Sequence, residues 1–210
     1  METLIIIDEQ NDFVDPMGSL FVKGAKEAVE ETIRYIEERK PQRIIVTLDT
    51  HSPLHMDLPG GWNRKFDNLP CFNPDPKDCE FETAARRLVG LGYPLVVWPN
   101  HCLRGSWGHA LPDSLMTTLT KWSLETGTSV EFIEKGLKEH EEMYSAFSVL
   151  GEDEITLPPY LERDNVTVVG VALDYCVKYS YLDLKKEGVN VNLFLPATAS
   201  IGEVEPYWKD

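Results

Sequence analysis

Short apolar runs, rich in β-branched residues, alternate along the chain with stretches of helical periodicity. The runs cover residues 3–7, 43–48, 94–98, 130–133, 166–171 and 189–195. Continuous apolar runs of this length are typical of strands that are buried on both faces, as the strands of a parallel sheet are. The pattern therefore predicts a mainly parallel sheet of about six strands.

Two of the intervening stretches predict helices that connect neighbouring strands. Ala25, Val29 and Ile36 recur at helical spacing after the first strand, and Pro41 stops the run. Residues 174–186 carry a similar apolar stripe before the last strand. Strands and helices that alternate in this way predict an α/β fold, with an open doubly wound sheet between two helical layers in a three-layer αβα arrangement.

The chain length of 210 residues fits one domain, so we treat residues 1–210 as a single unit. Two long segments, near residues 52–76 and 135–159, lack the strand and helix pattern but contain aromatic residues. Long loops inside compact domains are often functional. We expect both segments to form active-site loops.

Composition narrows the class of partner and the compartment. The chain has 35 acidic and 20 basic residues, a formal net charge of -15, which repels nucleic acid and anionic membrane surfaces. No apolar run is long enough to span a membrane, and the first residues lack the pattern of a signal peptide. Four cysteines without a CxxC pair favour reduced thiols. We expect a cytoplasmic protein that binds neither nucleic acid nor membrane, and leave a homo-oligomer open.

Standard sequence motifs exclude several classes of enzyme and metal site. The acidic residues after the first strand have Phe13 where a calcium loop needs glycine. Gly90 and Gly92 come before a strand, not after one, and form no dinucleotide fingerprint. There is no P-loop, HExxH or GxSxG motif either.

Polar residues follow almost every predicted strand. In chain order they are Asp8, residues 49–51, residues 98–101, Lys135 and residues 174–176. Each of them alone has an ordinary structural explanation, such as helix capping or a solvated charge. Ligands of open α/β sheets bind beyond the carboxyl ends of the strands, however, and these residues would all gather there. Their convergence predicts a functional site at that edge.

Cys176 is the candidate nucleophile at this edge. It lies where a strand leads into a helix, and the helix dipole there favours a thiolate. Asp174 can cap the same helix. A base and a cation are needed beside the sulfur, and Asp8 and Lys135 are the candidates from neighbouring strand ends. We expect Lys135 to keep Asp8 ionised and to favour the thiolate.

Asp49, His51 and His101 form a candidate metal site. Asp49 and His51 are two residues apart at a strand end, and His101 can approach from the next strand end. Two imidazoles and one carboxylate suit one divalent ion, with zinc first and iron(II) or manganese(II) as alternatives. Whether His55 or Asp57 adds a further ligand is left open.

The sequence resembles the isochorismatase-like cysteine hydrolases and, within them, the nicotinamidases and pyrazinamidases. Six segments carry the resemblance in chain order: residues 6–13 (IIDEQNDF), 49–53 (DTHSP), 98–102 (WPNHC), 134–136 (EKG), 144–147 (YSAF) and 170–177 (GVALDYCV). The Asp, Lys and Cys set resembles the whole family. The Asp-x-His and Trp-Pro-x-His-Cys segments resemble its metal-bearing nicotinamidase branch.

The resemblance implies roles for individual residues. It implies a catalytic triad of Asp8, Lys135 and Cys176, and metal ligands at Asp49, His51 and His101. It also implies a cis peptide between Val171 and Ala172, with the backbone N–H groups of Ala172 and Cys176 forming an oxyanion hole. Phe13, Trp98 and Tyr144 match the residues that enclose the flat pyridine ring of the substrate.

The implied activity is hydrolysis of the small molecule nicotinamide to nicotinate and ammonia, through a cysteine thioester, in NAD salvage. One alternative keeps the fold and the triad but hydrolyses another small amide, such as an N-carbamoyl compound. A second alternative is a non-catalytic scaffold in which Cys176 is merely buried.

Overall fold

The computed structural model describes residues 1–61, 96–139, 141–147 and 158–202. Five parallel strands in this part of the chain form one sheet in the order β3-β2-β1-β4-β5. The strands are β1 (Glu2–Ile7), β2 (Arg43–Asp49), β3 (Glu131–Lys135), β4 (Asn165–Val171) and β5 (Asn190–Ala199). The helices are α1 (Asn11–Val14), α2 (Ala25–Arg39), α5 (Asp113–Thr126) and α6 (Cys176–Lys186), with a 3-10 turn at Leu161–Arg163.

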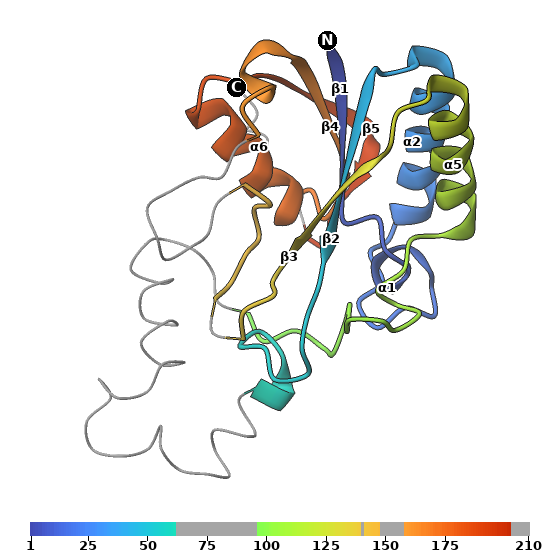
Figure 1. Cartoon of the computed structure of the whole chain (residues 1–210). Helices are drawn as coiled ribbons and strands as arrows, with labels where there is room; N and C mark the ends of the chain where they lie inside the picture. The colour runs from blue at the N-terminus through green and yellow to red at the C-terminus, as the bar shows by residue number, and fades with distance from the viewer. Residues whose placement is uncertain (62–95, 140, 148–157, 203–210) are drawn as a thin grey trace.

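The helices lie on both faces of the sheet, which confirms the predicted three-layer fold. In Figure 1, α2 and α5 cover one face and α6 covers the other. Helix α2 connects β1 to β2, and α6 connects β4 to β5, which lies toward the opposite edge of the sheet. Because crossovers between parallel strands are right-handed, these two helices lie on opposite faces. The described helices include none with the length and apolar character needed to cross a bilayer.

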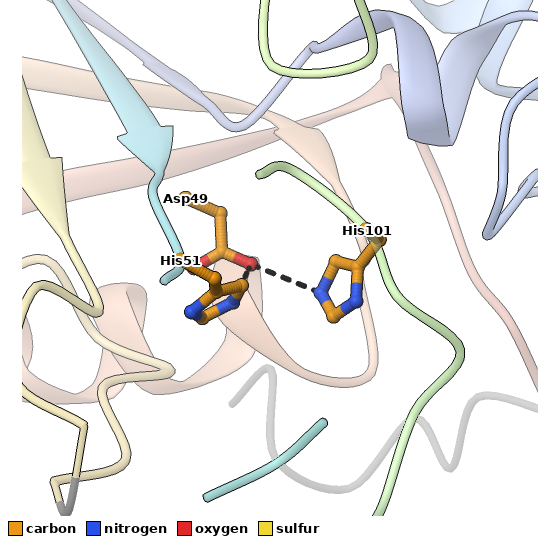
Figure 2. Close-up of side chains that lie close together, drawn as sticks. All are labelled: Asp49, His51 and His101. Carbon is orange, nitrogen blue, oxygen red and sulfur yellow. Dashed lines mark hydrogen bonds and ion pairs between the residues drawn. The ribbon is translucent and has the colours of Figure 1, made fainter. Parts of the chain in front are cut away.

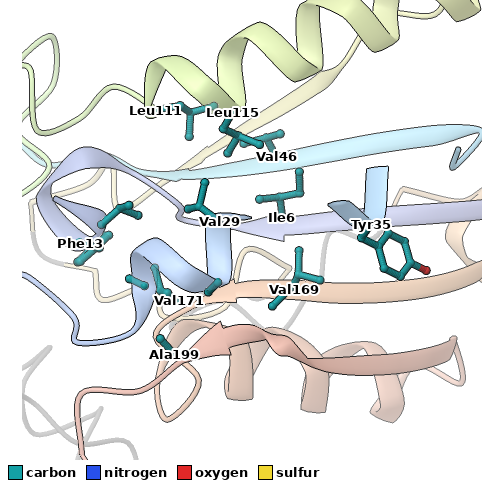
Figure 3. Packing of buried hydrophobic residues seen from close by; sticks show 14 of the residues in the cluster. Ile6, Phe13, Val29, Tyr35, Val46, Leu111, Leu115, Val169, Val171 and Ala199 are labelled. Atoms are coloured by element: carbon teal, nitrogen blue, oxygen red, sulfur yellow. The ribbon is translucent and has the colours of Figure 1, made fainter. Parts of the chain in front are cut away.

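Strand β1 shows why the apolar runs are continuous. Leu4 and Ile6 pack in the cluster under α2 and α5, whereas Ile5 and Ile7 pack in the cluster under α6. All four side chains are fully buried. Figure 3 shows part of the first cluster, where Ile6 lies near the side chains of its neighbouring strands and of α2. A strand buried on both faces needs an apolar residue at every position, not at alternate ones.

Helix α2 begins and ends where its sequence pattern predicts. Gly24 precedes it with φ of 89°, a left-handed conformation that glycine adopts without steric cost. Lys40 follows its last residue, Arg39, and Pro41 prevents continuation. The other predicted helix, 174–186, starts two residues later, at Cys176, because Tyr175 has non-helical backbone angles.

Two strand predictions need correction, and one helix was not foreseen from the sequence. In the predicted strand 94–98, residues 94 and 95 lie outside the described residues, and residues 96–98 form no strand. The Trp98 N–H instead donates to the Asp57 carbonyl oxygen. Strand β5 extends beyond the predicted 189–195 to Ala199, because an edge strand tolerates Pro196. Helix α5 was not predicted, although Leu115, Leu119 and Trp122 bury one face of it.

The order of the strands places a topological switch point between β1 and β4. From β1 the chain proceeds to β2 and then β3 on one side, whereas β4 lies on the other side of β1 and leads to β5. Open α/β sheets bind ligands at such a switch point, beyond the carboxyl ends of the strands. Asp8 follows β1 there, and Cys176 follows β4 after a short turn.

Candidate active site

Lys135 lies at the centre of the site, with its ammonium group between three candidate reactive residues. Its Nζ atom is 2.9 Å from Asp8 Oδ2, 2.9 Å from Asp49 Oδ1 and 3.5 Å from Cys176 Sγ. Register brings Lys135 and Asp49 side by side, because they are paired residues at the ends of β3 and β2. The structure thus brings together Asp8, Lys135 and Cys176, which the sequence placed at three separate strand ends.

Asp8 and Lys135 are both buried, and their pKa values differ from those of exposed side chains. Burial raises the pKa of Asp8 even though the Lys135 ammonium opposes the shift. For Lys135, burial alone lowers the pKa, but the Asp49 and Asp8 carboxylates outweigh it and the pKa is raised well above its usual value. Lys135 therefore stays protonated and supplies the positive charge of the site.

The thiol pKa of Cys176 shifts upward, not downward as expected from the sequence. Burial raises the pKa of the Cys176 thiol well above its usual value, and Asp8 and Asp49 add to this effect, while Lys135 opposes it. This direction is opposite to the one expected from the helix N-terminus, because loss of hydration is the largest influence on the thiol. Cys176 therefore needs a base to take its proton, and the Asp8 carboxylate is hydrogen-bonded to it.

Thr47 orients Asp8 and was not identified from the sequence. Its hydroxyl donates to Asp8 Oδ1 at 2.6 Å, and the Asp8 N–H donates to Thr47 Oγ1 at 3.1 Å. Thr47 lies on β2, the strand beside β1. The sequence offered one signal, a buried polar residue inside an apolar run.

Asp49, His51 and His101 come together as expected (Figure 2). Asp49 Oδ2 is 2.9 Å from His51 Nε2 and 3.3 Å from His101 Nε2. We expected His101 to come from a strand end, but it lies in a loop. That loop is held beside His51 by two backbone hydrogen bonds, from His51 N–H to the Cys102 oxygen and from Arg104 N–H to the His51 oxygen.

The three residues fit a divalent metal ion. Each offers a ligand atom, and these atoms lie within 4.8 Å of one another. His51 Nδ1 is buried without a hydrogen-bond partner among the described residues. Burial lowers the pKa of His51, but the Asp49 and Asp57 carboxylates outweigh it and raise the pKa to about 9. This excess of negative charge around His51 favours a cation in the site.

His55 and Asp57 lie beside the same imidazole. With His51 they form a second group whose ligand atoms lie within 4.8 Å of one another. His55 Nδ1 and Asp57 Oδ1 are hydrogen-bonded, and His55 Nε2 is 3.0 Å from the Glu141 carbonyl oxygen. Both His55 nitrogens thus have protein partners, whereas Asp57 lines the pocket. A ligand role for either residue remains a prediction.

A pocket is lined by Cys176 and by two of the candidate metal ligands, Asp49 and His101. Its walls include the three residues matched to the ring-binding positions, Phe13, Trp98 and Tyr144. Tyr175 contributes a further aromatic wall, with its ring edge-on to Trp98 at 5.1 Å between centroids. Four aromatic side chains thus line the same pocket as the Cys176 thiol, a lining that suits a planar ring.

The pocket also contains an acidic residue that the sequence analysis missed. Glu142 lines it and is only 3% exposed, and its Oε2 atom has no hydrogen-bond partner in the described part of the chain. Burial raises its pKa well above the usual value, with further contributions from Asp57 and Asp49. No local pattern marked Glu142, because it lies among the other glutamates of segment 135–159.

Ala172 and Cys176, the two residues of the implied oxyanion hole, both line the pocket. The peptide bond between Val171 and Ala172 is cis, as the resemblance implied. Ala172 lines the pocket beside Cys176. Cys176 is the first residue of α6, so its N–H is one of the first-turn donors that have no partner inside the helix.

No family model matches the chain. The similar proteins and solved structures, in contrast, are nicotinamidases. A curated nicotinamidase of Saccharomyces cerevisiae is 30% identical and covers 97% of this chain, which in turn covers 90% of that protein. The structure of the yeast nicotinamidase bound to the inhibitor nicotinaldehyde has a TM-score of 0.74 at 28% identity, covering 99% of this chain and 92% of the other.

A third similar protein is PnC1 from L. infantum, whose crystal structure contains nicotinate. It has a TM-score of 0.68 at 27% identity and covers 97% of this chain and 83% of its own. These relatives match the chain over almost its full length, and they therefore include both the sheet and the loops that carry the site.

Proposed function

The chain belongs to the nicotinamidase family, and from that premise we propose how its residues hydrolyse nicotinamide to nicotinate and ammonia. The single observation that carries the proposal is the position of Lys135, which lines the pocket and lies 3.5 Å from Cys176 Sγ and 2.9 Å from Asp8 Oδ2. This is the arrangement that an amidohydrolase with a buried cysteine nucleophile needs. The relatives do not favour the alternative of another small amide.

In the first half of the reaction, Asp8 takes the proton of Cys176, and the sulfur attacks the carboxamide carbon of nicotinamide. The negative charge that forms on the carbonyl oxygen is stabilised by the backbone N–H groups of Ala172 and Cys176. Asp8 then gives its proton to the amide nitrogen, the C–N bond breaks, and ammonia leaves. The product of this half is a thioester on Cys176.

In the second half, Asp8 takes a proton from a water molecule that attacks the thioester carbon. The C–S bond breaks, nicotinic acid is formed, and the Asp8 proton returns to the sulfur; the acid then loses its proton to solvent and leaves as nicotinate. The raised pKa values of Asp8 and Cys176 support this exchange, because burial disfavours the charged form of both groups. Lys135 stays charged throughout and compensates whichever of the two carries the negative charge.

Asp49, His51 and His101 would hold one divalent ion at the side of the pocket, for which we propose zinc. Two imidazoles and one carboxylate are a ligand set that zinc accepts readily, with open positions left over. When bound, the ion supplies Lewis-acid coordination for the pyridine nitrogen of the substrate. Phe13, Trp98 and Tyr144 enclose the ring, so that the carboxamide faces Cys176.

We also propose a cytoplasmic location and a role in NAD salvage. Cys102 and Cys176 are both free thiols, and thiols are kept reduced in the cytosol. Nicotinate, the product, is a pyridine carboxylate that an enzyme of nucleotide synthesis could consume. Growth on nicotinamide as sole pyridine source, in cells that lack their own nicotinamidase, would test the role.

The decisive experiment is ammonia release from nicotinamide by the purified protein and two cysteine variants. Cys176→Ala should lose activity, whereas Cys102→Ala, which also removes a buried thiol near the site, should keep it. Benzamide and an N-carbamoyl amine in the same assay test the alternative substrates. Equal loss in both variants, or faster turnover of the N-carbamoyl amine than of nicotinamide, would overturn the proposal.

A further inference from the structure

Strand β2 continues beyond the point where β1 leaves the sheet. The last paired residues of these strands are Ile6 and Val46, and β2 runs on to Asp49. Asp8 turns the chain away with a positive φ of 50°. Asp49 therefore has a strand partner on one side, β3, but none on the side of β1.

The side-chain amide of Gln10 occupies the place of the missing strand. Its Oε1 atom accepts the Asp49 N–H at 2.8 Å, and its Nε2 atom donates to the Asp49 carbonyl oxygen, also at 2.8 Å. The second Nε2 hydrogen is directed to the His109 carbonyl oxygen at 2.9 Å. Gln10 is fully buried, and each hydrogen-bonding group of its amide is used.

Asp49, the residue that Gln10 holds, contacts both Lys135 and a candidate metal ligand. Asp49 Oδ1 binds Lys135 Nζ at 2.9 Å, and Asp49 Oδ2 lies 2.9 Å from His51 Nε2. The backbone on the other side of Asp49 is fixed by β3, through the hydrogen bond from Thr50 N–H to the Lys135 oxygen. A shift of the Asp49 backbone would move its carboxylate relative to both Lys135 and the histidines.

We propose that Gln10 is a positioning residue of this active site, which replaces the absent strand beside Asp49 and thereby aims the Asp49 carboxylate at Lys135 and at the metal ligands. Gln10 touches neither substrate nor reacting atoms and acts through Asp49. The predicted effect of Gln10 on metal affinity requires only that Asp49, His51 and His101 bind the ion. The predicted effect on turnover rests also on the function proposed above. Residues that orient metal ligands in this way typically change metal affinity or activity by about 10- to 100-fold.

The test compares Gln10→Met with Asn11→Leu. Met keeps the size of Gln10 but cannot form the three hydrogen bonds. Asn11 is a matched control, because its side-chain amide donates to the Trp107 carbonyl oxygen at 2.9 Å and so anchors the same loop as Gln10 without touching Asp49. For each protein, the zinc dissociation constant is measured by chelator competition, along with kcat, KM and the melting temperature.

Gln10→Met should weaken zinc binding by at least about tenfold and lower kcat more than it raises KM. Asn11→Leu should change the zinc dissociation constant less than about threefold, even if its melting temperature falls as far as that of Gln10→Met. Gln10→Asn, which keeps the amide but shortens its reach, serves if Gln10→Met does not fold, and should weaken zinc binding in the same direction.

Wild-type zinc affinity in the Gln10 variants, or an equal loss in Asn11→Leu, would overturn the proposal. The first result would show that Asp49 keeps its position without the amide, and the second that only the loop anchor matters. A wild-type protein that binds zinc but does not hydrolyse nicotinamide would instead refute the proposed function, and zinc affinity would still decide the role of Gln10.

Discussion

Glu9→Gln should make the protein more stable at neutral pH. Glu9 follows β1 and is fully buried. The Thr32 hydroxyl donates to its Oε1 atom at 2.6 Å, and Oε2 has no partner among the described residues. Burial raises the pKa of Glu9 to about 8, and the Thr32 hydrogen bond offsets only part of the shift. The folded protein thus keeps a proton on Glu9 at pH values where the unfolded chain has released it.

The sign and size of the effect follow from this difference in bound protons. Between the unfolded pKa of 4.5 and the folded value of about 8, the folded state binds more protons, so the free energy of unfolding falls as pH rises. Each pH unit costs about 1.4 kcal/mol, or about 4 kcal/mol between pH 4.5 and pH 7.5. A typical domain has about 5–15 kcal/mol in total. Glutamine resembles the protonated acid in size and polarity and removes this pH dependence.

The assay is urea unfolding of the wild type and Glu9→Gln at pH 5, 6, 7 and 7.5. The two proteins should be about equally stable at pH 5, and the variant should gain an advantage that grows toward about 4 kcal/mol at pH 7.5. Glu30→Gln makes the same change of charge at an exposed position of α2 and serves as the control. Parallel stability curves for wild type and Glu9→Gln would refute the reasoning, because they would mean that Glu9 ionises in the folded protein as readily as in the unfolded chain.

Three further predictions concern the site. Cys176→Ala should lower kcat by several orders of magnitude while calorimetry still detects nicotinamide binding; residual activity above about 1% would remove Cys176 from the nucleophile role. His101→Ala should leave two ligands and a weak metal site, so that elemental analysis finds well under one ion per chain; wild-type stoichiometry would contradict the ligand set. Lys135→Met should leave Asp8 and Asp49 without their buried cation, costing about 3–5 kcal/mol of stability. It should also slow alkylation of Cys176, whereas pH–alkylation curves that superimpose on the wild type would show that Lys135 does not affect the thiol.

The sheet and the positions of its reactive residues were predictable from the sequence. A strand buried on both faces must be apolar throughout, so the runs containing β1, β2 and β4 were recognisable without knowledge of their neighbours. The carboxyl ends of parallel strands share one edge of the sheet whatever the strand order. Asp8, Asp49 and Lys135 could therefore be placed together before their order in the sheet was known.

The tertiary structure decided how these groups behave and which residues hold them. The pKa of Cys176 is raised, not lowered as expected, because burial, with the Asp8 and Asp49 carboxylates, outweighs the Lys135 ammonium. Burial and charge at one atom depend on residues distant in sequence, so no local pattern could reveal them. The same reason applies to His101, which reaches Asp49 from a loop, and to Gln10, whose partner lies 39 positions away.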